Sequence, residues 1–307
     1  MRIAALDLGT NTFLMLVVEY DGETLRPLHR ESEVVRLGRG LDASGYLTPA
    51  SMEKGLQCLE AFVRQAKELG ADPILACGTS ALREAKNADV FLHRARERTG
   101  LNIRVISGEQ EAEYSFFGAL SNKPDLPEPI VLVDIGGGST ELCGGTHRKM
   151  EKMLSVKIGS VRLTERFLRH DPVLPEEMDA VTEAIDRHLD RLPVLFPYQP
   201  PFSLIGNAGT VTTLAAMSLR LHRYDADKVD GCRLSLEGIE TLIGELARRT
   251  VEERKKMVGL PEKRADVILA GAVILSRVMR KLRQPELIVS DRGIRFGMIL
   301  DYLRRMQ

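Results

Sequence analysis

Two short stretches of the chain combine acids, glycines and hydroxyl side chains in the same order. Residues 134–142 read DIGGGSTEL and residues 7–15 read DLGTNTFLM. In each stretch an apolar run ends in Asp, and a turn with glycine, a Ser or Thr and a second apolar run follow. Glycine permits positive φ and lets a ligand approach the main chain, and inward-facing N–H groups form an anion-binding nest. Both stretches are therefore candidate phosphate loops.

Acidic and polar side chains flank both turns. Asp134 and Glu141 lie at the two ends of GGGST, and a hairpin would bring their carboxylates together. Mg²⁺ takes carboxylate, water and phosphate oxygens at once, so this pair is a candidate Mg²⁺ site beside a phosphate. Asn11 and Thr12 can donate to phosphate oxygens, and Asp7 can hold a metal-bound water. For each stretch read by itself, an ordinary hairpin with a solvated acid is the alternative.

Other loops of small residues precede predicted helices. CGTSALREA places Arg83 in a first helical turn, where free N–H groups attract anions and Arg adds a bidentate clamp. GNAGTVTTL, residues 206–214, has the same form. ISGEQEAEYSF begins a helix with three acids, of which Glu109 and Glu113 are explained by helix capping. One acid of this helix near a phosphate can act as a general base for an attacking water.

The elements that must position these loops follow an α/β pattern. Residues 3–9 and 13–22 predict a hairpin of apolar strands, and Thr48 with Pro49 begins a helix that runs to Gly70. A second helix is expected from about Pro175. Strand–loop–helix units are predicted at DPILACGTSALREA, LNIRVISGEQEAEYSFFGAL, FSLIGNAGTVTTLAAM and ELIVSDRGIRFGMILDYL, with a long apolar helix at ADVILAGAVILSRVMRKL. This alternation favours a mostly parallel or mixed sheet covered by helices.

The two loop stretches indicate an internal duplication. Setting Ile3 against Ile130 aligns Asp7 with Asp134 and Thr12 with Ser139. The spacing between Asp7 and Asp134 is much too long for a solenoid repeat and suits a duplicated domain. Chance similarity of two short hairpins is the alternative. Residues 121–129 hold three prolines and separate the halves. We therefore expect domains at 1–122 and 123–307, and leave open whether the last helix packs back on the first domain.

Bulk composition excludes several classes of protein. The 307 residues contain 43 Lys plus Arg and 43 Asp plus Glu, so no net charge recruits nucleic acid or an anionic membrane. Cys58, Cys77, Cys143 and Cys232 form no C-x-x-C pair, which favours reduced cytosolic thiols over disulfides or zinc. No apolar run reaches the roughly 20 residues of a membrane span, and the N-terminus lacks a signal-peptide pattern. We expect a cytoplasmic protein.

Several standard motifs are absent from the sequence. There is no Walker A loop, no G-x-G-x-x-G after a strand and no G-x-S-x-G. The HD dipeptide at His170 has no other suitably spaced His and Asp residues, and we interpret it as incidental. Phosphate binding in this chain must therefore use another kind of loop.

Taken together, the motifs resemble the exopolyphosphatase/guanosine pentaphosphate phosphohydrolase family. They occur in the order DLGTNT, GTSALREAKNAD, ISGEQEAE, DIGGGSTEL, NAGTVTTLAA, RADVILAGAVIL and SDRGIRFGMIL, nearly from end to end. The resemblance implies an actin-like ATPase superfamily fold, with two duplicated actin-like/ribonuclease H-like lobes and an interlobe phosphate-binding cleft. It also implies hydrolysis of a terminal phosphoanhydride in inorganic polyphosphate and/or guanosine pentaphosphate, and a possible homodimer.

The resemblance further implies roles for individual residues. The family's catalytic base maps onto Glu111, and the acids that bind its Mg²⁺ (or another divalent cation) map onto Asp134 and Glu141. Asp7 is a further candidate metal ligand, because of its position at the start of the DLGTNT loop. The implied phosphate contacts are Asn11, Thr12, Arg83, Gly136, Gly137, Gly138, Ser139, Gly209 and Thr210.

Other functions stay open at this point. Longer family members carry further C-terminal domains, so this chain looks like a short two-lobed form, which puts processive hydrolysis of long polyphosphate in doubt. A small-molecule kinase of the same superfamily would use an acid to activate a substrate hydroxyl. A non-catalytic alarmone or polyphosphate sensor would bind the same phosphates without needing a base.

Overall fold

The computed structural model describes residues 1–198 and 201–306, which pack as two units. Unit 1 comprises Met1–Tyr114 with Ile294–Gln307, and unit 2 comprises Ser115–Gly293. The chain passes from unit 1 into unit 2 within helix α5 (Gly108–Leu120) and returns just before helix α14 (Ile294–Met306). The boundary expected at 122/123 lies just after α5, whereas the packing boundary falls inside this helix.

Unit 1 is built on one five-stranded sheet with the order β3-β2-β1-β4-β5. Strands β1 (Arg2–Leu8), β2 (Thr12–Tyr20) and β3 (Leu25–Val34) form an antiparallel meander. Strands β4 (Ile74–Gly78) and β5 (Arg104–Val105) continue the sheet in parallel with β1. The polar Gly9–Asn11 turn joins β1 and β2, and both strands are almost entirely buried.

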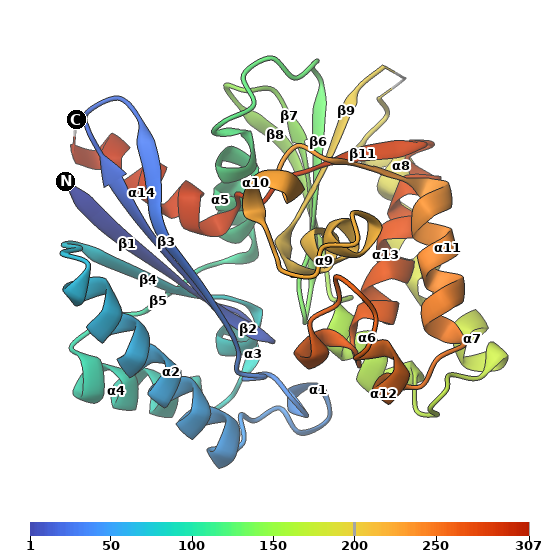
Figure 1. Ribbon diagram of the computed structural model, residues 1–307, viewed down its shortest axis with the longest axis horizontal. Helices are drawn as coiled ribbons and strands as arrows, with labels where there is room; N and C mark the ends of the chain where they lie inside the picture. The colour runs from blue at the N-terminus through green and yellow to red at the C-terminus, as the bar shows by residue number, and fades with distance from the viewer. Residues whose placement is uncertain (199–200, 307) are drawn as a thin grey trace. The chain divides into compact units, whose positions relative to one another are not determined.

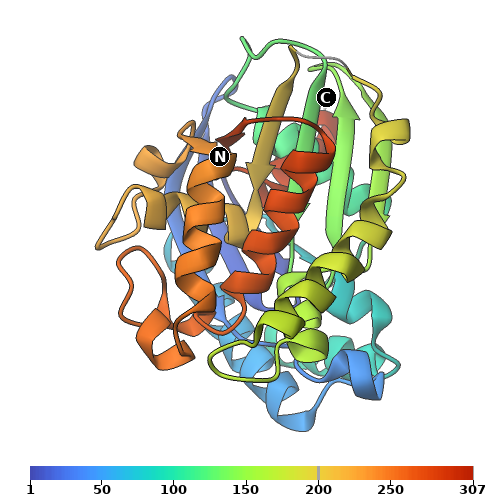
Figure 2. The same ribbon diagram turned by 90° about the vertical axis from the view of Figure 1, so that its right-hand side faces the viewer.

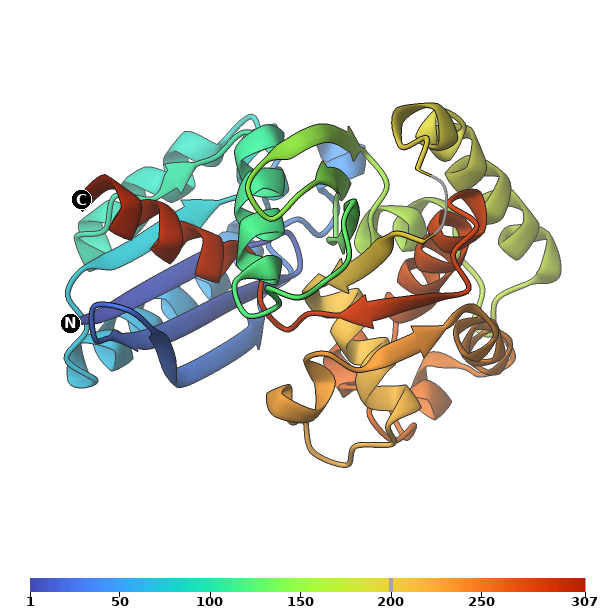
Figure 3. The same ribbon diagram turned by 90° about the horizontal axis from the view of Figure 1, so that it is seen from above.

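Helices cover both faces of the first sheet, because β1 and β2 carry apolar residues on both of their alternating faces. Ala4 and Leu6 of β1 face the core of α2 (Pro49–Glu68) and α4 (Ala88–Thr99), with α1 (Leu41–Ser44) and α3 (Ser80–Glu84) nearby in the chain. Ile3 and Ala5 face the other way, towards α14. Figures 1 and 3 show α14 along β1 on the face opposite α2. The helix predicted from Thr48 is confirmed, and the Thr48 side chain accepts a hydrogen bond from Ser51 N.

Unit 2 repeats this sheet and adds one strand. Its order is β8-β7-β6-β9-β11-β10, in which the first five strands correspond one for one to β3-β2-β1-β4-β5. The meander is antiparallel, β9 and β11 are parallel to β6, and β10 is antiparallel to β11. The bounds are β6 (Ile130–Ile135), β7 (Thr140–Gly145), β8 (Met150–Val156), β9 (Ser203–Asn207), β10 (Arg233–Ser235) and β11 (Glu286–Val289). The duplication predicted from two short loops is therefore a duplication of the whole sheet.

A large helical layer covers one face of the second sheet. It contains α6 (Ser160–Phe167), α7 (Pro175–Leu189), α8 (Leu192–Leu195), α9 (Ala208–Ser218), α10 (Ala226–Val229), α11 (Leu236–Ala247), α12 (Val251–Arg254), η1 (Glu262–Arg264) and α13 (Ile268–Lys281). Figure 2 shows α7, α11 and α13 lying over the strands. The helix α13 is apolar on nearly all sides because it lies inside this layer, where it contacts α6, α7, α9 and α11.

The α/β fold with two duplicated lobes that was predicted from the sequence is confirmed. Both units have the meander followed by parallel strands that defines a ribonuclease H-like, actin-like lobe. The third meander strands, β3 and β8, were not anticipated, because both are half-exposed and carry many charged residues. Within residues 1–198 and 201–306, no helix is both long and apolar enough to span a bilayer.

Candidate active site

The first phosphate loop is a tight turn whose polar side chains are buried. Gly9 N donates to Thr12 O over 3.1 Å, and Asp7, Asn11 and Thr12 are each less than 9% exposed. Arg36 N donates to Asn11 O over 2.8 Å and fixes the turn from the following loop. Both polar atoms of the Asn11 side chain are buried and have no hydrogen-bond partner among the described residues. A phosphate oxygen beside this turn would give the Asn11 amide the acceptor that the protein does not supply.

Glu111 lies in the first turn of α5 and is held by an arginine from another helix. Glu111 is 7% exposed, and Arg83 Nη1 donates to Glu111 Oε2 over 2.9 Å. The same Nη1 donates to Ile106 O over 2.9 Å, which fixes the guanidinium against the loop before α5. Sequence reasoning placed Arg83 at a helix start but did not anticipate its ion pair with Glu111.

Asp7 and Glu111 belong to the same part of unit 1. Asp7 on β1 lies beside Cys77 on the parallel strand β4. Burial raises the pKa of the Cys77 thiol well above its ordinary value, and the charges of Asp7 and Glu111 raise it further. Two carboxylates thus act on one buried thiol at the carboxyl ends of β1 and β4, the sheet edge where α/β proteins place ligands.

The second candidate phosphate loop has the same turn as the first. Gly136 N donates to Ser139 O over 3.0 Å, which matches the Gly9–Thr12 bond of unit 1. Gly136, Gly137 and Gly138 are not among the glycines with positive φ, so this turn does not use the left-handed conformation that glycine permits. Helix α6 packs closely against this turn. Val161 N donates to Gly137 O over 2.9 Å, and a Cβ on Gly159, the N-cap residue of α6, would overlap the Gly137 carbonyl.

Asp134 and Glu141 face each other across the second hairpin. They are direct partners in the antiparallel register of β6 and β7, so their side chains project from the same face of the sheet. Asp134 is 7% exposed and Glu141 is 2% exposed. In unit 1 the partner of Asp7 is Leu14. The paired carboxylates are therefore specific to the second loop, although the turn itself is duplicated.

Three side chains outside the hairpin bond these carboxylates. Ser115 Oγ of α5 donates to Asp134 Oδ2, and Ser155 Oγ of β8 donates to Glu141 Oε1 over 2.8 Å. Burial raises the pKa of Asp134, and hydrogen bonds from Ser115 and Asn207 oppose this rise without cancelling it. Sequence reasoning missed all three. Asn207 lies in the GNAGTVTTL loop, so its role could have been predicted, whereas no sequence pattern distinguished Ser115 or Ser155 from other serines.

The loop before α9 leaves a helix N-terminus available to an anion. Asn207 is the N-cap residue of α9, but its side chain makes no capping bond to the helix. It bonds Asp134 on the adjacent parallel strand instead. The N–H groups of the first turn, which includes Gly209 and Thr210, consequently lack this capping acceptor, and such groups bind phosphate readily.

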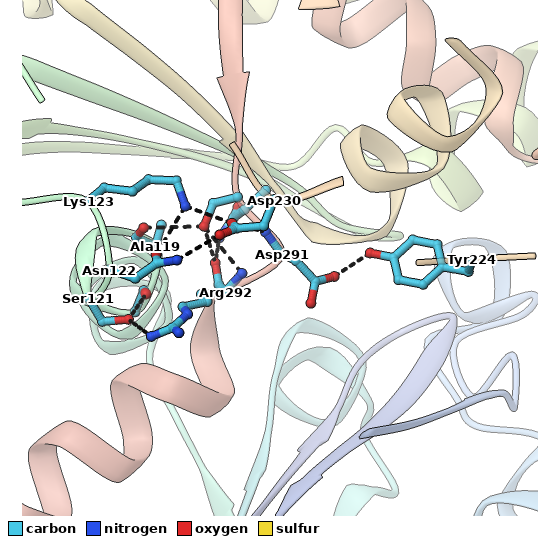
Figure 4. Close-up of polar contacts among 11 residues, drawn as sticks. Ala119, Ser121, Asn122, Lys123, Tyr224, Asp230, Asp291 and Arg292 are labelled. Carbon is cyan, nitrogen blue, oxygen red and sulfur yellow. Dashed lines mark hydrogen bonds and ion pairs between the residues drawn. The ribbon is translucent and has the colours of Figure 1, made fainter. Parts of the chain in front are cut away.

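A polar cluster holds the loop that follows β11, and Figure 4 shows its residues. Asp230 Oδ1 accepts hydrogen bonds from Lys123 Nζ over 2.7 Å and from Asp291 N over 3.0 Å. Asn122 Nδ2 donates to Asp230 Oδ2 over 2.7 Å. The loop so held carries Arg292 O, which accepts a 3.5 Å hydrogen bond from Asn207 Nδ2. Residues 290–293, which read SDRG, thus help to hold the Asn207 side chain that bonds Asp134.

The donor set at Asp134 and Glu141 fits a hard divalent cation. No group of three His, Cys, Asp or Glu side chains within residues 1–198 and 201–306 is arranged to hold a metal. Mg²⁺ does not need such a cage, because it keeps several waters and binds one or two carboxylates plus substrate phosphates. Burial raises the pKa of Asp134, because the ionised carboxylate loses hydration inside the protein. A cation bound beside it would stabilise the ionised form.

The fold and these loops define a duplicated α/β protein that handles phosphate groups. Residues 16–306 match the Ppx/GppA phosphatase family, and the chain belongs to this family. Exopolyphosphatase 2 of Mycobacterium tuberculosis is 34% identical over 97% of this chain and 98% of that protein.

Solved structures agree with this assignment. The crystal structure of an exopolyphosphatase from Cytophaga hutchinsonii is 30% identical over 99% of this chain and 98% of its own, with a TM-score of 0.92. The Aquifex aeolicus member of the Ppx/GppA family is 31% identical over 100% of this chain and 99% of its own, with a TM-score of 0.83.

Proposed function

We propose that this protein is a Mg²⁺-dependent exopolyphosphatase that also removes the terminal phosphate of guanosine pentaphosphate. Membership of the Ppx/GppA family makes it a hydrolase of phosphoanhydrides. The observation that supports the proposal most directly is the pairing of Asp134 with Glu141 beside the GGGST turn. Two buried carboxylates next to an anion-binding turn make chemical sense when a divalent cation lies between acid and phosphate.

The proposal gives each candidate residue a role. Mg²⁺ would be held by Asp134 and Glu141, with Asp7 also assigned to the cation, and it would neutralise phosphate charge. Glu111 is the general base, and Arg83 keeps its carboxylate in one orientation through the 2.9 Å bond. The phosphate groups are assigned to Asn11, Thr12, Arg83, the N–H groups of Gly136, Gly137, Gly138 and Ser139, and the first turn of α9 at Gly209 and Thr210.

In the proposed chemistry, Glu111 activates a water molecule while ordered hydrogen-bond donors of the protein hold the phosphate groups. Glu111 accepts a proton from water while that oxygen attacks the terminal phosphorus. The bond to the bridging oxygen then breaks, and the shortened chain leaves with the electron pair. Donors that are already ordered stabilise the charge on the transferring group without reorganisation. The buried Asn11 amide is such a donor, because its hydrogen-bonding groups are unused among the described residues.

Phosphate release by the full chain tests this function. Short and long polyphosphate, guanosine pentaphosphate and ATP are each incubated with enzyme at several Mg²⁺ concentrations. We expect release from polyphosphate and pentaphosphate, and a loss of about 10²–10⁴-fold in kcat for Glu111→Gln. The ratio of kcat/KM values then identifies the preferred substrate and chain length.

A matched control lies on the same helix. Glu113 is exposed two residues from Glu111, so Glu113→Gln makes the same chemical change without touching the buried carboxylate. It should retain wild-type activity. If the protein binds these substrates but releases phosphate from none of them, the proposed hydrolase function is contradicted and a sensor is favoured.

A further inference from the structure

Each carboxylate of the Asp134–Glu141 pair is bonded by a serine outside the loop motifs. Ser115 Oγ donates to Asp134 Oδ2, and Ser155 Oγ donates to Glu141 Oε1 over 2.8 Å. Ser115 belongs to α5 and Ser155 to β8. The hydroxyls therefore come from elements other than the β6 strand and β7 strand that carry the acids, and they fix the acids from outside.

The two hydroxyls differ in their access to water. Ser115 is 0% exposed, whereas Ser155 lies at an exposed position of the edge strand β8. Water can replace an exposed hydroxyl as a hydrogen-bond donor at little cost, but it cannot easily enter a closed site. Removal of the Ser115 hydroxyl leaves the buried Asp134 carboxylate without that donor. The two positions should therefore contribute unequally.

We propose that Ser115 is a positioning residue that orients the Asp134 carboxylate for a divalent cation. Ser155 has the same role, with a smaller effect, at Glu141. The inference rests on the cation site of the proposed function. A carboxylate already held in one orientation loses less conformational freedom when it binds a cation. Outer hydrogen-bond partners of metal ligands typically change metal affinity by about 10–100-fold when they are removed.

Binding of Mn²⁺ to the full chain, without substrate, tests the inference. Free Mn²⁺ is followed by electron paramagnetic resonance and the heat of binding by calorimetry. We expect Kd to rise about 10–100-fold in Ser115→Ala and by a smaller factor in Ser155→Ala. Ser115→Thr keeps the hydroxyl and should recover most of the lost affinity.

A control serine lies in the same sheet. Ser203 is 7% exposed, donates to Pro127 O over 2.7 Å and is in register with Ile130, at the other end of β6 from Asp134. Ser203→Ala deletes a buried hydroxyl from the sheet without touching either carboxylate. Its Mn²⁺ affinity should equal that of the wild type, even where its melting temperature falls.

The outcomes separate this inference from the proposed function. Unchanged Mn²⁺ affinity in a folded Ser115→Ala protein overturns the role of Ser115 and leaves the cation site standing. A wild-type protein that binds no Mn²⁺ at millimolar concentration overturns this inference, whereas the proposed function is decided separately by the phosphate-release assay. Ser115→Cys has nearly the same volume and a weaker donor. If the alanine variant does not fold, weaker binding by the cysteine variant supports the inference and unchanged binding overturns it.

Discussion

At the scale of single residues, the candidate site contains polar groups that the folded chain does not satisfy. Asn11 is the clearest case, because its amide nitrogen and oxygen are both buried without a partner among the described residues. Leaving a buried polar group unpaired typically costs about 1–3 kcal/mol of stability. A binding site can retain such a group when the ligand supplies the missing partner, so stability and binding should oppose each other at this position.

Replacing Asn11 with Ala separates the two effects. We expect the free energy of unfolding to rise by about 1 kcal/mol, because the unpaired amide is gone. The KM for polyphosphate should rise at the same time. Urea denaturation and steady-state kinetics measure the two quantities on the same preparation. A variant that is less stable than the wild type while its KM is unchanged would show that Asn11 is structural.

At the scale of elements, the Asp230 cluster joins the end of α5 to the loop before α14. Burial opposes ionisation of Asp230, but hydrogen bonds from Lys123 and Asn122 outweigh it and lower its pKa. A lowered carboxyl pKa stabilises the fold above the unfolded-state value, which is about 3.9 for Asp. The contribution is lost as pH falls through the lower folded-state pKa. Both elements should therefore loosen in acid.

Asp230→Asn tests this cluster. It leaves the buried Lys123 ammonium without its carboxylate, so we expect a loss of about 3 kcal/mol in unfolding free energy at neutral pH. The difference from wild type should shrink below about pH 4. Chemical denaturation across pH 3–7 measures it, with the exposed Asp227→Asn in the neighbouring α10 as the control. A pH-independent difference would mean that charge at Asp230 is not what stabilises the cluster.

At the scale of the whole molecule, the two units differ in how the chain builds them. Unit 2 is one continuous segment with its own large core. Unit 1 needs the C-terminal helix α14, since Phe296, Ile299 and Leu303 cover Ile3 and Leu16 of its sheet. Burial of a Phe or Ile side chain stabilises by about 1.5–3 kcal/mol, so loss of α14 exceeds what a small unit can absorb.

Fragments of the chain test this difference. Residues 115–293 expressed alone should melt cooperatively, whereas residues 1–114 should aggregate because one face of the sheet is exposed. Joining 1–114 to 294–307 through a Gly/Ser linker should restore folding. Circular dichroism and size-exclusion chromatography distinguish these states. A cooperative melt of 1–114 at the temperature of the linked fragment would contradict the role of α14.

The sequence by itself determined the fold class, the duplication and most of the loops. The continuous apolar runs of β1 and β6, the glycine turns and the Thr48–Pro49 helix start are local patterns, and local propensity and burial act in the same direction there. The pairing of Asp134 with Glu141 was also predictable, because a short hairpin fixes which residues face each other. These features depend on residues close together in the chain.

Only the tertiary structure decided which distant residues support the site. The Arg83–Glu111 pair, the hydroxyl of Ser115 at Asp134 and the use of Asn207 as a carboxylate partner all join separate elements. No local pattern encodes such contacts, since they depend on how helices and strands pack after they form. The close packing of α6 on the second loop is of the same kind, because a Cβ on Gly159 at the start of α6 would overlap the Gly137 carbonyl.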